Sequence, residues 1–116
     1  MQIIQFSFRI LLAISISIVT ILSVQEVNIE SSVNFLDKVL HFLCFSYLTL
    51  ITWLSQILNK DLHVYAIVLA YGILIEIVQR FLPYRSFEYL DIFADSVGII
   101  AGLIIIKIFK NLYPKY

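Results

Sequence analysis

Acidic, basic and imidazole side chains lie inside or beside the apolar segments of this sequence, where a charge is costly and asks for a function. The polar residues concerned are Asp37, Lys38, His41, Glu76, Gln79, Arg80, Arg85, Asp91 and Asp95. Three pairs are four residues apart, a spacing that places side chains on one helix face: Asp37 and His41, Glu76 and Arg80, and Asp91 and Asp95. The acidic side chains and the histidine could transfer protons or hold a cation, and the lysine and arginine side chains could bind a phosphate or a carboxylate.

The composition indicates a membrane protein. Of 116 residues, 61% are apolar and 14% are charged, and the mean hydropathy is +0.97; a soluble domain is about half apolar and about a quarter charged. A transmembrane helix needs roughly 20 apolar residues. We therefore predict an all-α, polytopic membrane protein, with residues 1–116 as a single domain and four transmembrane helices in a compact bundle. These helices are expected at about 6–24, 35–58, 62–82 and 88–109.

The basic residues gather at one end of the predicted bundle. Four spans place the N-terminus, the 59–61 turn and the C-terminus on one side, with Arg9, Lys60, Lys107, Lys110 and Lys115 against a single acid, Asp61. The other side carries Lys38, Arg80 and Arg85 against Glu26, Glu30, Asp37, Glu76, Glu88, Asp91 and Asp95. The positive-inside rule predicts that the first side, with both termini, is cytoplasmic.

This topology brings the intramembrane polar residues to the outer face. His41 and Asp95 would lie one helical turn, about 6 Å, deeper than Asp37 and Asp91, so we predict a shallow polar pocket. The acidic residues of this pocket outnumber its basic residues, so the acids in excess must take up protons, hold a cation or meet a basic ligand. Oxygen-rich ligands suit magnesium or calcium. With one histidine at this face and no close ligand motif, however, no metal and no cofactor are predicted.

Small residues indicate where helices pack closely. Gly98 and Gly102 continue the helix face of Asp91 and Asp95, and side chains of this size let two membrane helices approach each other. Ala13, Ser17 and Thr20 share a face of the first apolar segment. We predict that both stripes are packing surfaces.

The polar residues also follow a known order and spacing. An Asp-Lys-x-x-His sequence opens the second apolar segment, Glu-x-x-Gln closes the third, an arginine follows a proline-containing turn, and Asp-x-x-x-Asp leads into Gly-x-x-x-Gly. The residues are Asp37, Lys38, His41, Glu76, Gln79, Pro83, Arg85, Asp91, Asp95, Gly98 and Gly102. From 37 to 102 the chain resembles the VanZ-like family of small bacterial membrane proteins. Asp95 departs from that pattern, which has an asparagine there, so an amide donor is replaced by a charge.

The resemblance implies a multi-pass protein of the bacterial cytoplasmic (inner) membrane with a role in the cell envelope. One member of the family is linked to low-level resistance to teicoplanin, so glycopeptide tolerance is among the implied roles. We predict that the pocket binds an amphiphile: membrane lipid, a lipid-linked envelope precursor or a lipophilic antibiotic. Lys38, Arg80 and Arg85 would hold its anionic group.

Two alternatives stay open. One is a membrane enzyme that acts on envelope lipid or glycan precursors, with His41 or an acid as the base; the other is a non-catalytic assembly partner of another membrane protein. The chain has no nucleophile elbow, phosphate loop or zinc signature, which disfavours the familiar enzyme classes. A net charge of zero gives no reason to expect nucleic acid as a partner, and the sequence predicts no oligomeric state.

Overall fold

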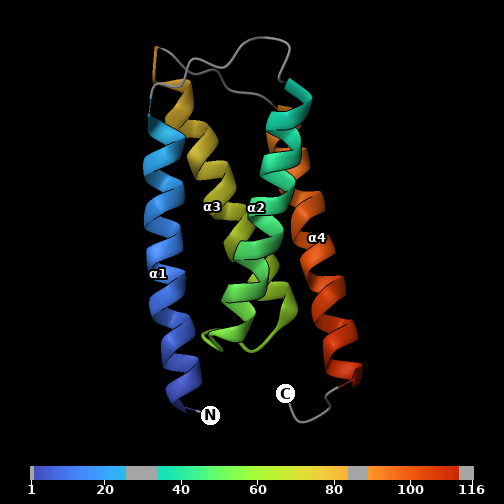
Figure 1. The fold of residues 1–116 in the computed structure, drawn as a ribbon. Helices are drawn as coiled ribbons and strands as arrows, with labels where there is room; N and C mark the ends of the chain where they lie inside the picture. Colours follow the sequence, from blue (N-terminus) through green and yellow to red (C-terminus); the bar gives the residue numbers. More distant parts are fainter. Residues whose placement is uncertain (1, 26–33, 84–88, 113–116) are drawn as a thin grey trace.

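The computed structural model describes residues 2–25, 34–83 and 89–112, with backbone alone for residues 34–37. These residues form four α-helices and no strand: α1 (Gln2–Val24), α2 (Asn34–Leu54), α3 (Asp61–Arg80) and α4 (Tyr89–Leu112). The helices run up and down side by side, with α2 and α3 in the centre and α1 and α4 at opposite edges (Figure 1). The predicted all-α bundle of four helices is confirmed.

The helices have the length and composition of membrane segments. α1, α3 and α4 are each long and apolar enough to cross a bilayer, whereas the apolar part of α2 is shorter and covers Lys38–Leu54. Large apolar side chains cover their outer surfaces; Ile18, Ile67 and Ile104 are each more than half exposed. An outward-facing apolar surface of this extent is what a lipid environment requires.

Helices α2 and α4 form the most extensive interface in the bundle. A Cβ atom on Gly98 would stand 2.4 Å from the carbonyl oxygen of Phe42, and one on Gly102 would stand 2.9 Å from Thr49 Cβ. The hydroxyl of Ser46 donates a hydrogen bond to the carbonyl oxygen of Gly98 at 2.8 Å. Glycine thus lets the two backbones touch.

Helix α1 packs differently from the prediction. Ala13 and Ser17 are exposed, so that part of the predicted packing face is wrong, and the buried residues of α1 are Leu12 and Ser15. The reason lies in tyrosines on the neighbouring helices. Ser15 hydrogen-bonds the hydroxyl of Tyr47 at 2.8 Å, and Thr20, although exposed, hydrogen-bonds the hydroxyl of Tyr71 at 2.6 Å. These bonds orient α1.

Helix α2 ends at Leu54, four residues before the predicted end. The chain turns at Gln56, whose φ is 53°. Arg9 of α1 donates from Nε to the carbonyl oxygen of Ser55 at 3.0 Å and from Nη2 to that of Gln56 at 3.5 Å. A cationic donor at the C-terminus of a helix satisfies carbonyl groups and opposes the helix dipole.

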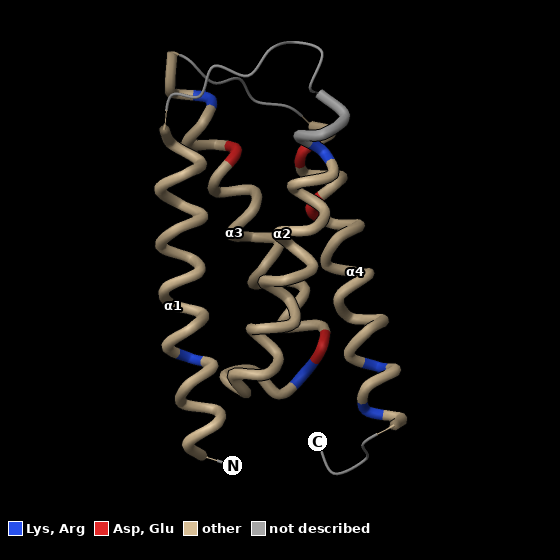
Figure 2. The backbone as a smooth tube through the Cα atoms, in the orientation of Figure 1, with Lys and Arg blue, Asp and Glu red and all other residues tan. Residues whose placement is uncertain are grey.

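Charge is divided between the two ends of the bundle (Figure 2). Lysine and arginine predominate at the end where α1 begins and α4 finishes, and there Lys110 lies 3.4 Å from Asp61 and over the ring of Trp53. The remaining acidic residues of the described part of the chain lie toward the opposite end.

Candidate functional site

Helices α2, α3 and α4 bring five polar side chains together near one end of the bundle. Lys38 and His41 come from α2, Glu76 from α3, and Asp91 and Asp95 from α4. We call these five residues the buried polar cluster. The exposed fractions of its acids are 0% for Glu76, 1% for Asp95 and 5% for Asp91. The acids are therefore buried between helices, rather than lining an open mouth as the predicted shallow pocket implied.

Ion pairs and hydrogen bonds link α2 to α4 within this cluster. Lys38 Nζ donates to Asp91 Oδ1 at 2.5 Å. His41 Nδ1 and Asp95 Oδ1 are 2.8 Å apart, and His41 Nε2 is 3.8 Å from Asp91 Oδ2. An ionised Asp95 can only accept a hydrogen bond, and the His41 tautomer with a proton on Nδ1 is the one that donates to it. The imidazole ring thus has one acid at each of its nitrogens.

Two residues that the sequence did not single out support this arrangement. A Cβ on Gly72 would stand 2.9 Å from both Asp95 Oδ2 and Phe45 Cε1, so α3 approaches closely there only because residue 72 is glycine. The ring of Phe45 stacks on His41, with centroids 6.5 Å apart and planes within 5°. The signal for Gly72 was available in the sequence, since an isolated glycine inside an apolar helix points to close packing.

The other predicted site residues have different places. Gln79 donates from Nε2 to the carbonyl oxygen of Ser23 at 2.9 Å, which ties α3 to α1. Arg80 is exposed at the end of α3. The side chain of Asp37 and the whole of Arg85 lie outside the described residues.

A groove runs beside the cluster, between α2 and α4. It encloses about 280 Å³ and is lined by Lys38, Val39, Phe42, Leu90, Phe93, Ala94 and Val97. All of these are apolar apart from Lys38. Lys38 therefore lines the apolar groove, while its ammonium is bonded to Asp91 in the buried polar cluster.

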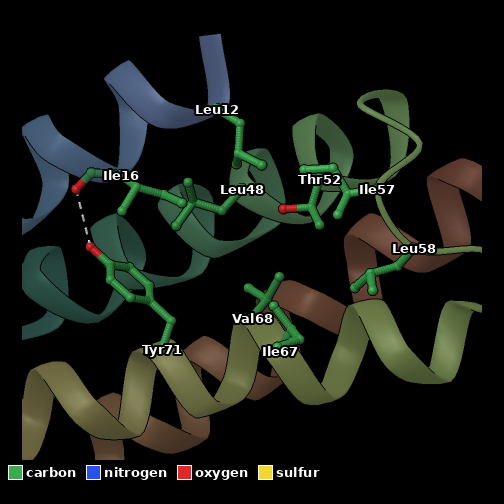
Figure 3. A pocket seen from close by; sticks show the side chains of 9 residues that line it. All are labelled: Leu12, Ile16, Leu48, Thr52, Ile57, Leu58, Ile67, Val68 and Tyr71. Carbon is green, nitrogen blue, oxygen red and sulfur yellow. Dashed lines mark hydrogen bonds between the residues drawn. The ribbon is translucent and has the colours of Figure 1, made fainter. Parts of the chain in front are cut away.

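A second cavity of about 160 Å³ lies further along the bundle, between α1, α2 and α3 (Figure 3). Its lining is almost wholly apolar: Leu12, Ile16, Leu48, Thr52, Ile57, Leu58, Ile67, Val68 and Tyr71. The hydroxyl of Tyr71 donates to the carbonyl oxygen of Ile16 at 3.3 Å. The Phe45 ring contacts both Tyr71 and His41, so it lies between this cavity and the buried polar cluster.

Comparison with known proteins gives this architecture a family. The sequence model of the VanZ/LLP1 family matches residues 2–110, which include α1, α2, α3 and all but the last two residues of α4. The chain belongs to the VanZ/LLP1 family. The resemblance predicted from residues 37–102 is thereby confirmed and extended to α1. A comparison with curated proteins and a comparison with solved structures gave no match.

Membership of the VanZ/LLP1 family, together with the apolar helices, identifies a membrane protein. In this VanZ/LLP1 chain the buried polar cluster holds three carboxylates, one ammonium and one imidazole. With His41 neutral, its formal charge is therefore −2. Carboxylates of this kind are the groups that bind protons or cationic partners.

Proposed function

We propose that this VanZ/LLP1 protein binds an anionic amphiphile of the cell envelope in the groove between α2 and α4. One observation carries the proposal: Lys38, whose ammonium lies 2.5 Å from Asp91, is the one charged residue among the side chains that line an otherwise apolar groove. An amphiphile has the matching structure, with an anionic head for Lys38 and a hydrocarbon chain for the apolar wall. A phospholipid, a lipid-linked envelope precursor and a lipophilic glycopeptide share this chemistry.

The proposal includes a membrane topology. All four helices cross the bacterial cytoplasmic membrane, with both termini in the cytoplasm and the buried polar cluster toward the outer face. The division of charge between the two ends of the bundle supports this orientation by the positive-inside rule. The apolar Lys38–Leu54 stretch is shorter than a typical span, but Lys38 at its outer end can extend its ammonium to the head-group layer.

Photo-crosslinking tests the proposal directly. The purified protein is placed in bilayer discs with an anionic phospholipid that carries a diazirine on its acyl chain, and the modified peptides are identified by mass spectrometry. We expect labelling of the segments 38–42 and 90–97. Equal labelling along all outer helix faces would contradict the proposal.

Two substitutions and a matched control sharpen this experiment. Lys38→Gln removes the cation and Ala94→Phe fills the groove, so each should reduce labelling of the groove several-fold. Lys107→Gln removes the same charge at the opposite end, where Lys107 is exposed, and should leave the labelling unchanged. If the groove of Lys38→Gln is labelled as strongly as that of the wild-type protein, the ammonium of Lys38 does not hold the anionic head of the lipid.

A second candidate function follows from His41. Asp95, 2.8 Å from Nδ1, holds the imidazole in the orientation that a general base needs, so the cluster could promote hydrolysis or transfer on an envelope lipid. Incubation of the protein with envelope lipids, followed by mass spectrometry, tests this function. A product that appears with wild-type protein and not with His41→Gln would support a catalytic function. Lipid binding without any product would contradict it.

A further inference from the structure

We propose that the buried polar cluster binds a transition-metal dication, such as Zn²⁺ or Mn²⁺, through His41 Nε2, Asp91 Oδ2 and the carboxylate of Glu76. This site differs from the amphiphile groove, where Lys38 and apolar side chains form the wall. It rests on the geometry of three helices and does not require the proposed function to be correct.

The ligand atoms already converge. One ligand atom from each of His41, Glu76 and Asp91 lies within 4.8 Å of the other two. An ion equidistant from three atoms at that largest spacing would be about 2.8 Å from each, whereas zinc bonds to nitrogen and oxygen are roughly 2.0–2.2 Å long. Each atom therefore has to approach by at most roughly 0.6–0.8 Å, a movement that a small change of side-chain torsion supplies.

The contacts behind the ligands have the pattern of a metal site. Asp95 Oδ1 lies 2.8 Å from His41 Nδ1, and the neutral tautomer that donates to it has its lone pair on Nε2, which lies 3.8 Å from Asp91 Oδ2. Lys38 holds the other oxygen of Asp91 at 2.5 Å and so directs Oδ2 toward the ring. Metal-binding histidines usually donate their second N–H to a carboxylate, and ligating carboxylates are in turn hydrogen-bonded.

The chemistry of the ligands favours a dication. Glu76 and Asp91, two of the three proposed ligands, are buried carboxylates. Carboxylate oxygens and a histidine nitrogen are ligands of divalent metal ions in proteins. His41 determines the class of metal, because imidazole suits zinc and other transition metals, whereas magnesium and calcium prefer oxygen ligands alone.

Metal binding is measured on the full chain in detergent, purified with a peptide tag that contains no histidine. After the protein is stripped with a chelator, Zn²⁺ and Mn²⁺ are added separately and the bound metal is quantified by mass spectrometry and titration calorimetry. No amphiphile is added, and the lipid crosslinking above is repeated with chelator present, so failure of one proposal is distinguishable from failure of the other. We expect one equivalent of metal per chain; wild-type protein that retains none overturns the proposal.

Variants identify the ligands. His41→Gln and Glu76→Gln should weaken binding by about 100-fold or more, and Asp95→Asn, which acts through His41, by roughly 10- to 100-fold. His63→Gln is the matched control because His63 is exposed near the start of α3, and it should bind metal as wild type does. Unchanged binding in His41→Gln, or loss of binding in His63→Gln, overturns the proposal.

A spectroscopic measurement on wild-type protein keeps the test independent of whether the variants fold. The ¹⁵N chemical shift of His41 Nε2 should change on addition of Zn²⁺, while Nδ1 stays protonated. A shift at His63 alone, or no shift at either histidine, would contradict the assignment.

Discussion

A Cβ atom on Gly98 would stand only 2.4 Å from the carbonyl oxygen of Phe42. This is the shortest such distance among the three glycines, and Gly98 lies about one turn after Asp95, which hydrogen-bonds His41. The backbone contact therefore sets the distance across which the buried polar cluster forms.

Gly98→Ala should lower the free energy of unfolding by about 1–3 kcal/mol, because the added methyl meets backbone rather than a flexible side chain. Alanine's higher helix propensity, worth up to about 1 kcal/mol, acts in the opposite direction. Thermal unfolding in detergent measures the balance. Val78→Ile, which adds one methylene at an exposed position of α3, is the control and should have little effect; a Gly98→Ala variant as stable as that control would refute the packing role.

Asp95→Asn and Asp95→Ala should differ in stability. Asparagine, the residue of the family pattern at this position, keeps an oxygen that accepts from His41 Nδ1. Alanine leaves the buried N–H without that acceptor, at a cost of about 1–3 kcal/mol. We expect Asp95→Asn to unfold near the wild-type temperature and Asp95→Ala well below it. An equal fall in unfolding temperature in the two variants would show that the 2.8 Å contact contributes little to stability.

Arg9→Gln should destabilise the end of α2, because the guanidinium donates to the carbonyl groups of Ser55 and Gln56. The expected loss is about 1 kcal/mol, since the contact is partly exposed to solvent. Hydrogen exchange of the amides around residues 55–56 measures local opening. Lys107→Gln removes an equal charge from the same end of the bundle, and protection that falls equally in both variants would point to a general charge effect.

Reporter fusions test the proposed orientation. A reporter that is active only in the cytoplasm should function when fused after Tyr116 and should fail when inserted near Glu30, because four crossings place these positions on opposite sides. The complementary reporter, active only outside, should give the reverse result. Activity of the cytoplasmic reporter near Glu30 but not after Tyr116 would invert the topology.

Much of the site could be anticipated because polar residues in apolar helices are rare and their spacing is regular. The separation of Asp91 and Asp95 by four residues places both on the face of α4 that meets α2, and the alternation of helix directions brings His41 and Glu76 to the same end. That reasoning depends only on helical periodicity and on the crossing of a bilayer.

Other features depend on contacts between distant parts of the chain. The early end of α2 involves Arg9, which lies 46 residues before Ser55. The sequence near the end of α2 does not predict that contact. Burial of the acids likewise results from the touching backbones at Gly98 and from Gly72, which lets α3 approach Asp95. Spacing can place side chains on a face, but how tightly two faces close depends on both helices together.

The extensive α2–α4 interface has a consequence for how the protein is made. α2 leaves the ribosome early, carrying Lys38 and His41, yet Asp91 and Asp95 are synthesised roughly fifty residues later. Until then α2, whose apolar stretch is short, lacks those two acidic partners. If α2 spans the bilayer as proposed, we expect its stable integration to await translation of α4, and we expect a nascent chain that stops after α3 to be more sensitive to membrane proteases.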